Sequence, residues 1–195
     1  MKNNIVLIGM PGVGKSSAGV VLAKAMGYHF VDSDIVIQHK EGRLLSDIIE
    51  ECGNDGFLKI EDRINSELEA DKTVIATGGS VICFKFRINS ELEADKTVIA
   101  TGGSVIYGKK AMEHLKEIGI VVYLKAEFAT INERLSNLKG RGVAIKEGQT
   151  LKDLYDERCV LYEKYADITI PLDGMSIEET VGTLVPLIVK FQRNE

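Results

Sequence analysis

Residues 9–16 read Gly-Met-Pro-Gly-Val-Gly-Lys-Ser and fit the phosphate-loop pattern G-x-x-x-x-G-K-[ST]. The apolar run Ile-Val-Leu-Ile at 5–8 precedes this loop and predicts a buried parallel strand. Apolar residues recur at helical spacing after the loop, so a helix is expected to begin near Lys15. A strand, a glycine turn and a helix N-terminus direct backbone N–H groups at an anion. The stretch therefore predicts a nucleotide-phosphate site, with Lys15 on the β- and γ-phosphates and the Ser16 hydroxyl on Mg²⁺.

The composition limits the classes of function. The chain has 195 residues, of which 45% are hydrophobic, and this suits a single domain with its own core. A net charge of -5 argues against nucleic acid or a membrane surface as the main partner, because both need a basic patch. Cys52, Cys83 and Cys159 are not spaced as metal ligands and predict free thiols in a reducing cytoplasm. No signal peptide or membrane-spanning run is expected.

Two carboxylates follow the second expected strand, residues 29–32. Asp32 and Asp34 are two residues apart, so both should leave the sheet on one side, at the carboxyl ends of strands where open α/β sheets bind ligands. The alternative is helix capping, because Asp32, Ser33 and Asp34 are all good N-caps for a helix over 35–40. The two interpretations are compatible, since one residue can cap while another takes part in chemistry.

An internal repeat interrupts the alternation of expected strands and helices. Residues 63–82 read RINSELEADKTVIATGGSVI, and residues 87–106 repeat them letter for letter. Each copy holds a β-prone stretch followed by Gly-Gly, yet only one can form a given central strand. The first copy is joined to the upstream helix and the second to the downstream helix, so either can supply the strand. The spare segment must loop out, replace an element or pair as an added strand, and loop-closure entropy grows slowly enough for an insertion to be tolerated.

Two segments are expected to move. Residues 42–58 are punctuated by Gly42, Gly53 and Gly56, which predicts short helices that shift over a substrate. Residues 139–149 contain three glycines and a basic cluster, which predicts a flexible lid. The other elements are expected as helices at 57–69, 109–116, 128–138, from 150 and after 176, and as strands at 72–76, 119–124 and 167–171.

One arginine lies where an apolar residue is expected. Arg158 falls on the apolar stripe of the helix that begins at Thr150, which has a capping box with Asp153. A guanidinium on such a face needs an anionic partner. That partner is either an internal carboxylate or the carboxylate or phosphate of a ligand.

Taken together, these segments resemble the shikimate kinase family of small P-loop kinases. The matching segments occur in family order: 9–16, 32–34, 76–80 or 100–104, the arginines 134 and 141, 157–170 and the C-terminal helix. The resemblance implies an α/β fold with a five-stranded parallel sheet flanked by helices. It also implies one kinase domain over 1–195, with a substrate subdomain at about 34–62, the duplicated segment 63–82/87–106 and a lid at about 139–149.

The resemblance also implies an activity and the residues that carry it. The activity is transfer of the γ-phosphoryl group of ATP, with Mg²⁺, to a hydroxyl of a small anionic hydroxy acid, first of all shikimate, by a monomer. The implied nucleotide-binding residues are Gly12, Val13, Gly14, Lys15, Ser16, Ser17, Arg134 and Arg141. Ser16 and Asp32 are the implied metal ligands, and the implied substrate-binding residues are Asp34, Gly79 or Gly103, and Arg158. Lys15, Asp34 and Arg141 are the implied catalytic residues.

Three residues depart from the family pattern. Leu58 stands where the family has an arginine after Phe57, and an apolar side chain cannot form the bidentate pair that a carboxylate would use. Losing one charge-assisted contact costs about 1.5–3 kcal/mol, or roughly one to two decades of affinity. A serine replaces the third glycine after the strand, and Val160 replaces a proline. Two alternatives therefore stay open, a kinase of the same fold for another hydroxy acid and a nucleotide-binding protein without phosphotransfer.

Overall fold

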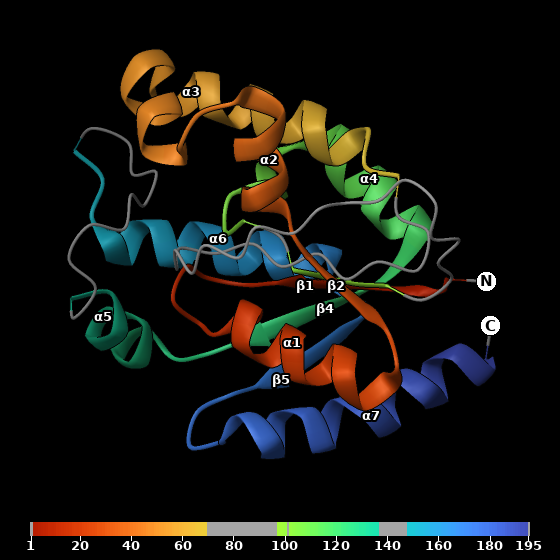
Figure 1. Ribbon diagram of the computed structural model, residues 1–195. Coiled ribbons are helices and arrows are strands. Elements are labelled where there is room, and N and C mark those ends of the chain that lie inside the picture. The colour runs from red at the N-terminus through yellow and green to blue at the C-terminus, as the bar shows by residue number, and fades with distance from the viewer. Residues whose placement is uncertain (1, 70–96, 101, 137–147, 195) are drawn as a thin grey trace.

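The computed structural model describes residues 2–69, 97–100, 102–136 and 148–194 (Figure 1). Its centre is a five-stranded sheet in the order β2-β3-β1-β4-β5, and every pairing is parallel. The strands are β1 (Asn4–Ile8), β2 (His29–Asp32), β3 (Thr97–Ala100), β4 (Gly119–Lys125) and β5 (Ile168–Pro171). The expected five-stranded parallel sheet is confirmed, and the chain has a P-loop kinase fold.

β1 lies in the middle of the sheet because its side chains are buried on both faces. All five of its residues are buried, and Val6 is in register with Ile99 of β3 and Val121 of β4. Parallel strands of similar length end at the same edge of a sheet. The segments that follow Ile8, Asp32 and the last residue of β3 therefore meet at one edge, and this edge carries the candidate site.

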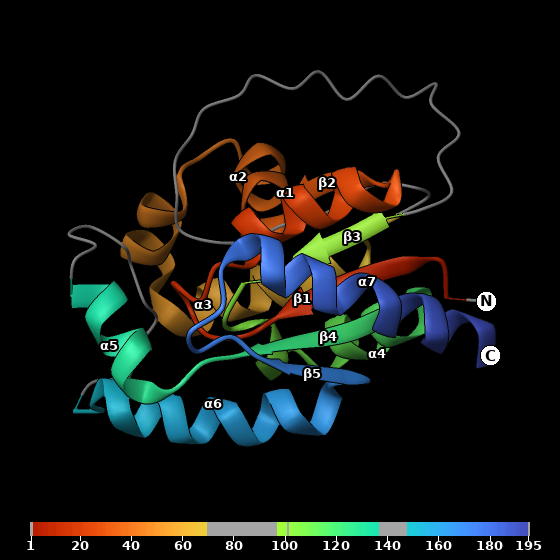
Figure 2. The ribbon, with the colours of Figure 1, turned by 90° about the horizontal axis from the view of Figure 1, so that it is seen from below.

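Helices cover both faces of the sheet. They are α1 (Lys15–Met26), α2 (Ser33–Glu41), α3 (Leu45–Ser66), η1 (Val105–Tyr107, a 3-10 turn), α4 (Lys109–Ile118), α5 (Phe128–Ser136), α6 (Leu151–Tyr165) and α7 (Ile177–Asn194). α1 packs against α7 on one face, and α3 packs against α4 on the other. Figure 2 shows the strand order directly, with α6 on the β5 side of the sheet.

Local sequence signals account for several helix ends. The capping box of Thr150 and Asp153 at the start of α6 is present as predicted. α3 contains a kink at Gly53, whose φ of 67° is left-handed, so a break there is confirmed. The break expected at Gly56 is wrong, because this glycine continues the helix. A glycine in a helix interior costs only about 1 kcal/mol, and the buried stripe that includes Phe57 and Ile64 outweighs it.

The two copies of the repeat are used in different places. The first copy supplies the end of α3, where Ile64 and Asn65 are buried. The second copy supplies β3 and η1, where Val98 and Val105 are buried. The structure therefore assigns the central strand to the second copy. The strand expected at 72–76 and the candidate Gly79 lie outside the described residues, as does most of the expected lid, including Arg141.

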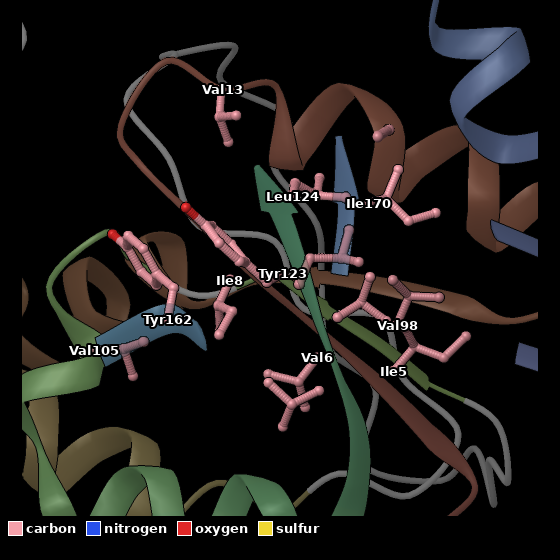
Figure 3. Packing of buried hydrophobic residues seen from close by; sticks show 14 of the residues in the cluster. Ile5, Val6, Ile8, Val13, Val98, Val105, Tyr123, Leu124, Tyr162 and Ile170 are labelled. Carbon is pink, nitrogen blue, oxygen red and sulfur yellow. The ribbon is translucent and has the colours of Figure 1, made fainter. Parts of the chain in front are cut away.

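One hydrophobic core joins the sheet to its helices. Figure 3 shows side chains of β1 and β4 packed beside the Tyr162 ring of α6. A smaller cluster of Ile37, Ile48, Phe57 and Ile64 holds α2 against α3. Within the described part of the chain, no helix is long and apolar enough to cross a membrane.

Candidate functional site

The phosphate-loop residues lie between β1 and α1 as predicted. Gly14 is the N-cap of α1 with a φ of 105°, a left-handed conformation that favours glycine. Lys15 is 3% exposed, and its amine donates to the carbonyl oxygens of Gly9 at 2.8 Å and Met10 at 3.1 Å. These two bonds hold the amine against the backbone of the loop.

The charge of Lys15 is sensitive to its surroundings. The pKa of Lys15 is lowered to about 8, mainly by burial and in part by the nearby positive charge of Arg158. The carboxylates of Asp34, Asp32 and Glu61 oppose this shift. An anion at the loop would likewise favour the charged form.

Asp32 caps α2 and also approaches the phosphate loop. Its side chain accepts from the backbone N–H of Asp34 at 3.0 Å, so the capping interpretation is confirmed. The Ser16 hydroxyl lies 3.5 Å from Asp32 Oδ2, which brings the two expected metal ligands together. Burial and the neighbouring charge of Asp34 raise the pKa of Asp32 to about 8, so a cation at this position would stabilise the carboxylate.

The donors at this position fit Mg²⁺. Magnesium prefers oxygen ligands and is usually held by one or two protein groups together with substrate phosphates. The hydroxyl of Ser16 and the carboxylate of Asp32 are such groups. The described residues contain no cluster of three or more His, Cys, Asp or Glu side chains that could hold a metal by itself.

The glycine turn after β3 is the meeting point of the site. A Cβ atom on Gly102 would collide with Glu61 Oε1 and lie 3.6 Å from Asp34 Oδ1. A Cβ on Gly103 would lie 2.7 Å from Pro11 Cδ and 3.1 Å from Arg158 Nη1. Only glycines allow the backbone to pass this close. The structure thus brings the predicted residues Asp34, Gly103 and Arg158 to one turn.

Arg158 is buried next to that turn and lines a small pocket. Its side chain is 2% exposed, and its guanidinium carbon lies 5.4 Å from the centre of the Tyr107 ring. The pocket is lined by Asn54, Asp55, Leu58, Tyr107, Gln149, Leu154 and Arg158. Leu58 therefore forms part of the wall of the pocket that contains the arginine.

Two further predicted residues are placed near the phosphate loop. Arg134 of α5 donates from Nη1 to the carbonyl oxygen of Val13 at 3.0 Å, which joins α5 to the loop. Ser17 is exposed on the first turn of α1.

Glu61 is a further site residue, which was not predicted from the sequence. This carboxylate is 1% exposed, and neither oxygen has a hydrogen-bond partner of good geometry among the described residues. Burial raises the pKa of Glu61 to about 8, against the lowering effects of Ser104 and Arg158. A signal was available, because Glu61 lies on the apolar stripe of its helix, between Phe57 and Ile64, just as Arg158 interrupts the stripe of α6. Tyr107 was also missed, and no sequence pattern marks it.

Comparisons with known proteins agree with this geometry. The sequence model of the family described as shikimate kinase matches residues 11–90 and again 85–188, so that each match contains one copy of the repeat. The shikimate kinase of Actinobacillus succinogenes is 35% identical over 194 residues, and the match covers 97% of both chains. That of Haemophilus influenzae is 34% identical over 191 residues, covering 96% of this chain and 93% of its own.

Solved structures show the same likeness. A shikimate kinase from Acinetobacter baumannii, solved in complex with shikimate, superposes with a TM-score of 0.77 at 30% identity, over 96% of this chain and 93% of its own. The shikimate kinase from Aquifex aeolicus gives a TM-score of 0.66 at 26% identity, over 98% of this chain and 97% of its own.

Proposed function

Because the chain belongs to the shikimate kinase family, we propose that it transfers the γ-phosphoryl group of ATP to a hydroxyl of shikimate, giving shikimate 3-phosphate. One observation carries the choice of acceptor. Asp34 and Arg158 approach the same glycine turn, at Gly102 and Gly103 respectively. A carboxylate orients hydroxyl groups, and a guanidinium binds a carboxylate by two parallel hydrogen bonds. The pair suits a small molecule that carries both groups.

The proposed mechanism relies on position and charge. Asp34 holds the attacking hydroxyl and accepts its proton as the oxygen bonds to the γ-phosphorus. The bond from that phosphorus to the bridging oxygen breaks, and ADP leaves. Lys15 neutralises charge on the phosphates from within the loop, and Arg158 fixes the carboxylate end of the acceptor.

Ser16 and Asp32 would hold Mg²⁺, and the bound ion would supply positive charge against the phosphate oxygens. Asp32 keeps its place because it also caps α2. We assign Arg134 to the nucleotide, because it bonds the phosphate loop at Val13. Arg141 is proposed as the lid arginine from its position in the sequence alone.

We further propose one kinase domain with a mobile substrate subdomain at 34–62 and a lid at 139–149, acting as a monomer in the cytoplasm. The kink at Gly53 supports movement within the subdomain. Cys52 and Cys159 are free thiols, as a reducing compartment requires. Light scattering at several protein concentrations tests the monomer.

The test of function is ADP release from Mg·ATP with and without shikimate, on the wild type and on Arg158→Lys. Lysine keeps the charge but loses the planar fork, so the variant should raise the KM for shikimate about 10- to 100-fold. Its KM for ATP should stay within about twofold. Arg63→Lys is the matched control, because Arg63 bonds Glu41 on the exposed side of α3. ADP release that ignores shikimate would reject the proposal.

A second candidate is a kinase of the same fold for another small hydroxy acid. The position of Leu58 in the pocket wall favours it, because this side chain adds no charge for a carboxylate. A panel of hydroxy acids in the same assay separates the two, since the preferred acceptor has the highest kcat/KM.

A further inference from the structure

α6 carries two buried polar side chains one turn apart. Arg158 is 2% exposed and Tyr162 is completely buried. The Tyr162 hydroxyl donates to the carbonyl oxygen of Gly103 at 2.5 Å. A phenylalanine would fill the apolar stripe equally well, so the hydroxyl serves its polar contacts and not the packing. These contacts are the bond to Gly103 and the neighbouring Arg158 guanidinium.

The ring of Tyr162 is fixed from its other side. It stacks on Tyr123 of β4 with 5.0 Å between ring centres and an angle of 25° between planes (Figure 3). The Tyr123 hydroxyl in turn lies 3.3 Å from the sulfur of Cys159. Tyr162 of α6 therefore contacts both the glycine turn, through its hydroxyl, and β4, through its ring.

The bond from Tyr162 to Gly103 matters because little space surrounds Gly103. It lies between Pro11 of the phosphate loop and Arg158, as the close approaches of its hypothetical Cβ show. Any shift of the turn would change the spacing between the phosphate loop and the guanidinium. A misplacement of about 1 Å at reacting groups can cost about 100-fold in rate.

We propose that Tyr162 is a positioning residue for the acceptor, acting through the carbonyl of Gly103. It sets the glycine turn, and with it the distance from the carboxylate-binding Arg158 to the phosphate loop. The inference rests on the proposed function, because it assumes that the acceptor lies against this turn.

The experiment compares Tyr162→Phe with Tyr123→Phe. Each variant removes one phenolic oxygen from the same stacked pair, but only the first breaks the bond to Gly103. Tyr162→Phe should raise the KM for shikimate about 10-fold and leave the KM for ATP within about twofold. Tyr123→Phe should leave both constants within about twofold. Equal shikimate KM values in the two variants would overturn the inference.

A second readout separates this inference from the proposed function. Amide hydrogen exchange of the segment 102–108 should be faster in Tyr162→Phe and unchanged in Tyr123→Phe. If the wild type does not turn over shikimate, the proposed function fails, and the exchange rates still decide whether Tyr162 holds the turn. Equal exchange in both variants would then overturn it.

Discussion

Deleting residues 83–106 should stabilise the protein and leave its activity intact. Because the copies are identical, this deletion gives the same sequence as deleting 70–93, so it removes residues only from the connection between α3 and β3. That connection contains 27 residues outside the described part, 70–96, and three would remain. The entropic cost of closing this loop on folding then falls by about 2 kcal/mol. For a chain of this length, the melting temperature should rise by about 4–8 °C.

The assay is thermal unfolding, followed by ADP release with shikimate. The control replaces 70–93 with a glycine-serine stretch of equal length, which keeps the connection long but erases the first copy of the strand. This variant should melt within a few degrees of the wild type, because β3 comes from the second copy. A deletion variant that unfolds, or a control that loses its fold, would refute the assignment of the strand and the entropy argument with it.

Two further predictions concern side chains of the site. Glu61→Gln should become increasingly more stable than the wild type as pH rises from 4.5 to 8. The unfolded wild type releases its proton near the ordinary pKa of 4.5, whereas the folded protein keeps it to about 8, so wild-type stability falls across this window, by about 3 kcal/mol at pH 7. Thermal melts at several pH values measure the difference, and a constant difference would contradict the assigned pKa. Leu58→Arg should lower the KM for shikimate about 10-fold by adding a second guanidinium to the pocket, and Leu58→Met is the uncharged control. An unchanged KM would show that the acceptor does not contact this wall.

Local signals in the sequence were enough for most of the fold. The apolar run of β1 and the glycines before Lys15 predict a strand, a turn and a helix from neighbouring residues alone. The same holds for the capping box at Thr150. Glu61 was harder, because a charge on an apolar stripe shows that a partner is needed but does not name it.

The use of the repeat could not be predicted from local sequence. The two copies have the same propensities, so only their connections distinguish them. With the second copy in the sheet, the additional residues come before β3 in the sequence and not between β3 and η1. With the first copy, they would separate Ile82 from Tyr107, whose ring packs against Arg158. Connectivity over many residues therefore decides between the copies.

The division of the repeat between two elements also has a genetic consequence. Selection for the packing of α3 acts on the first copy, at Ile64 and Asn65. Selection for the strand and the glycine turn acts on the second copy, at Val98 and Gly103. Neither copy can replace the other at these positions. We therefore expect descendants of this gene to conserve the beginning of the first copy and the end of the second copy. The end of the first copy and the beginning of the second should accumulate substitutions.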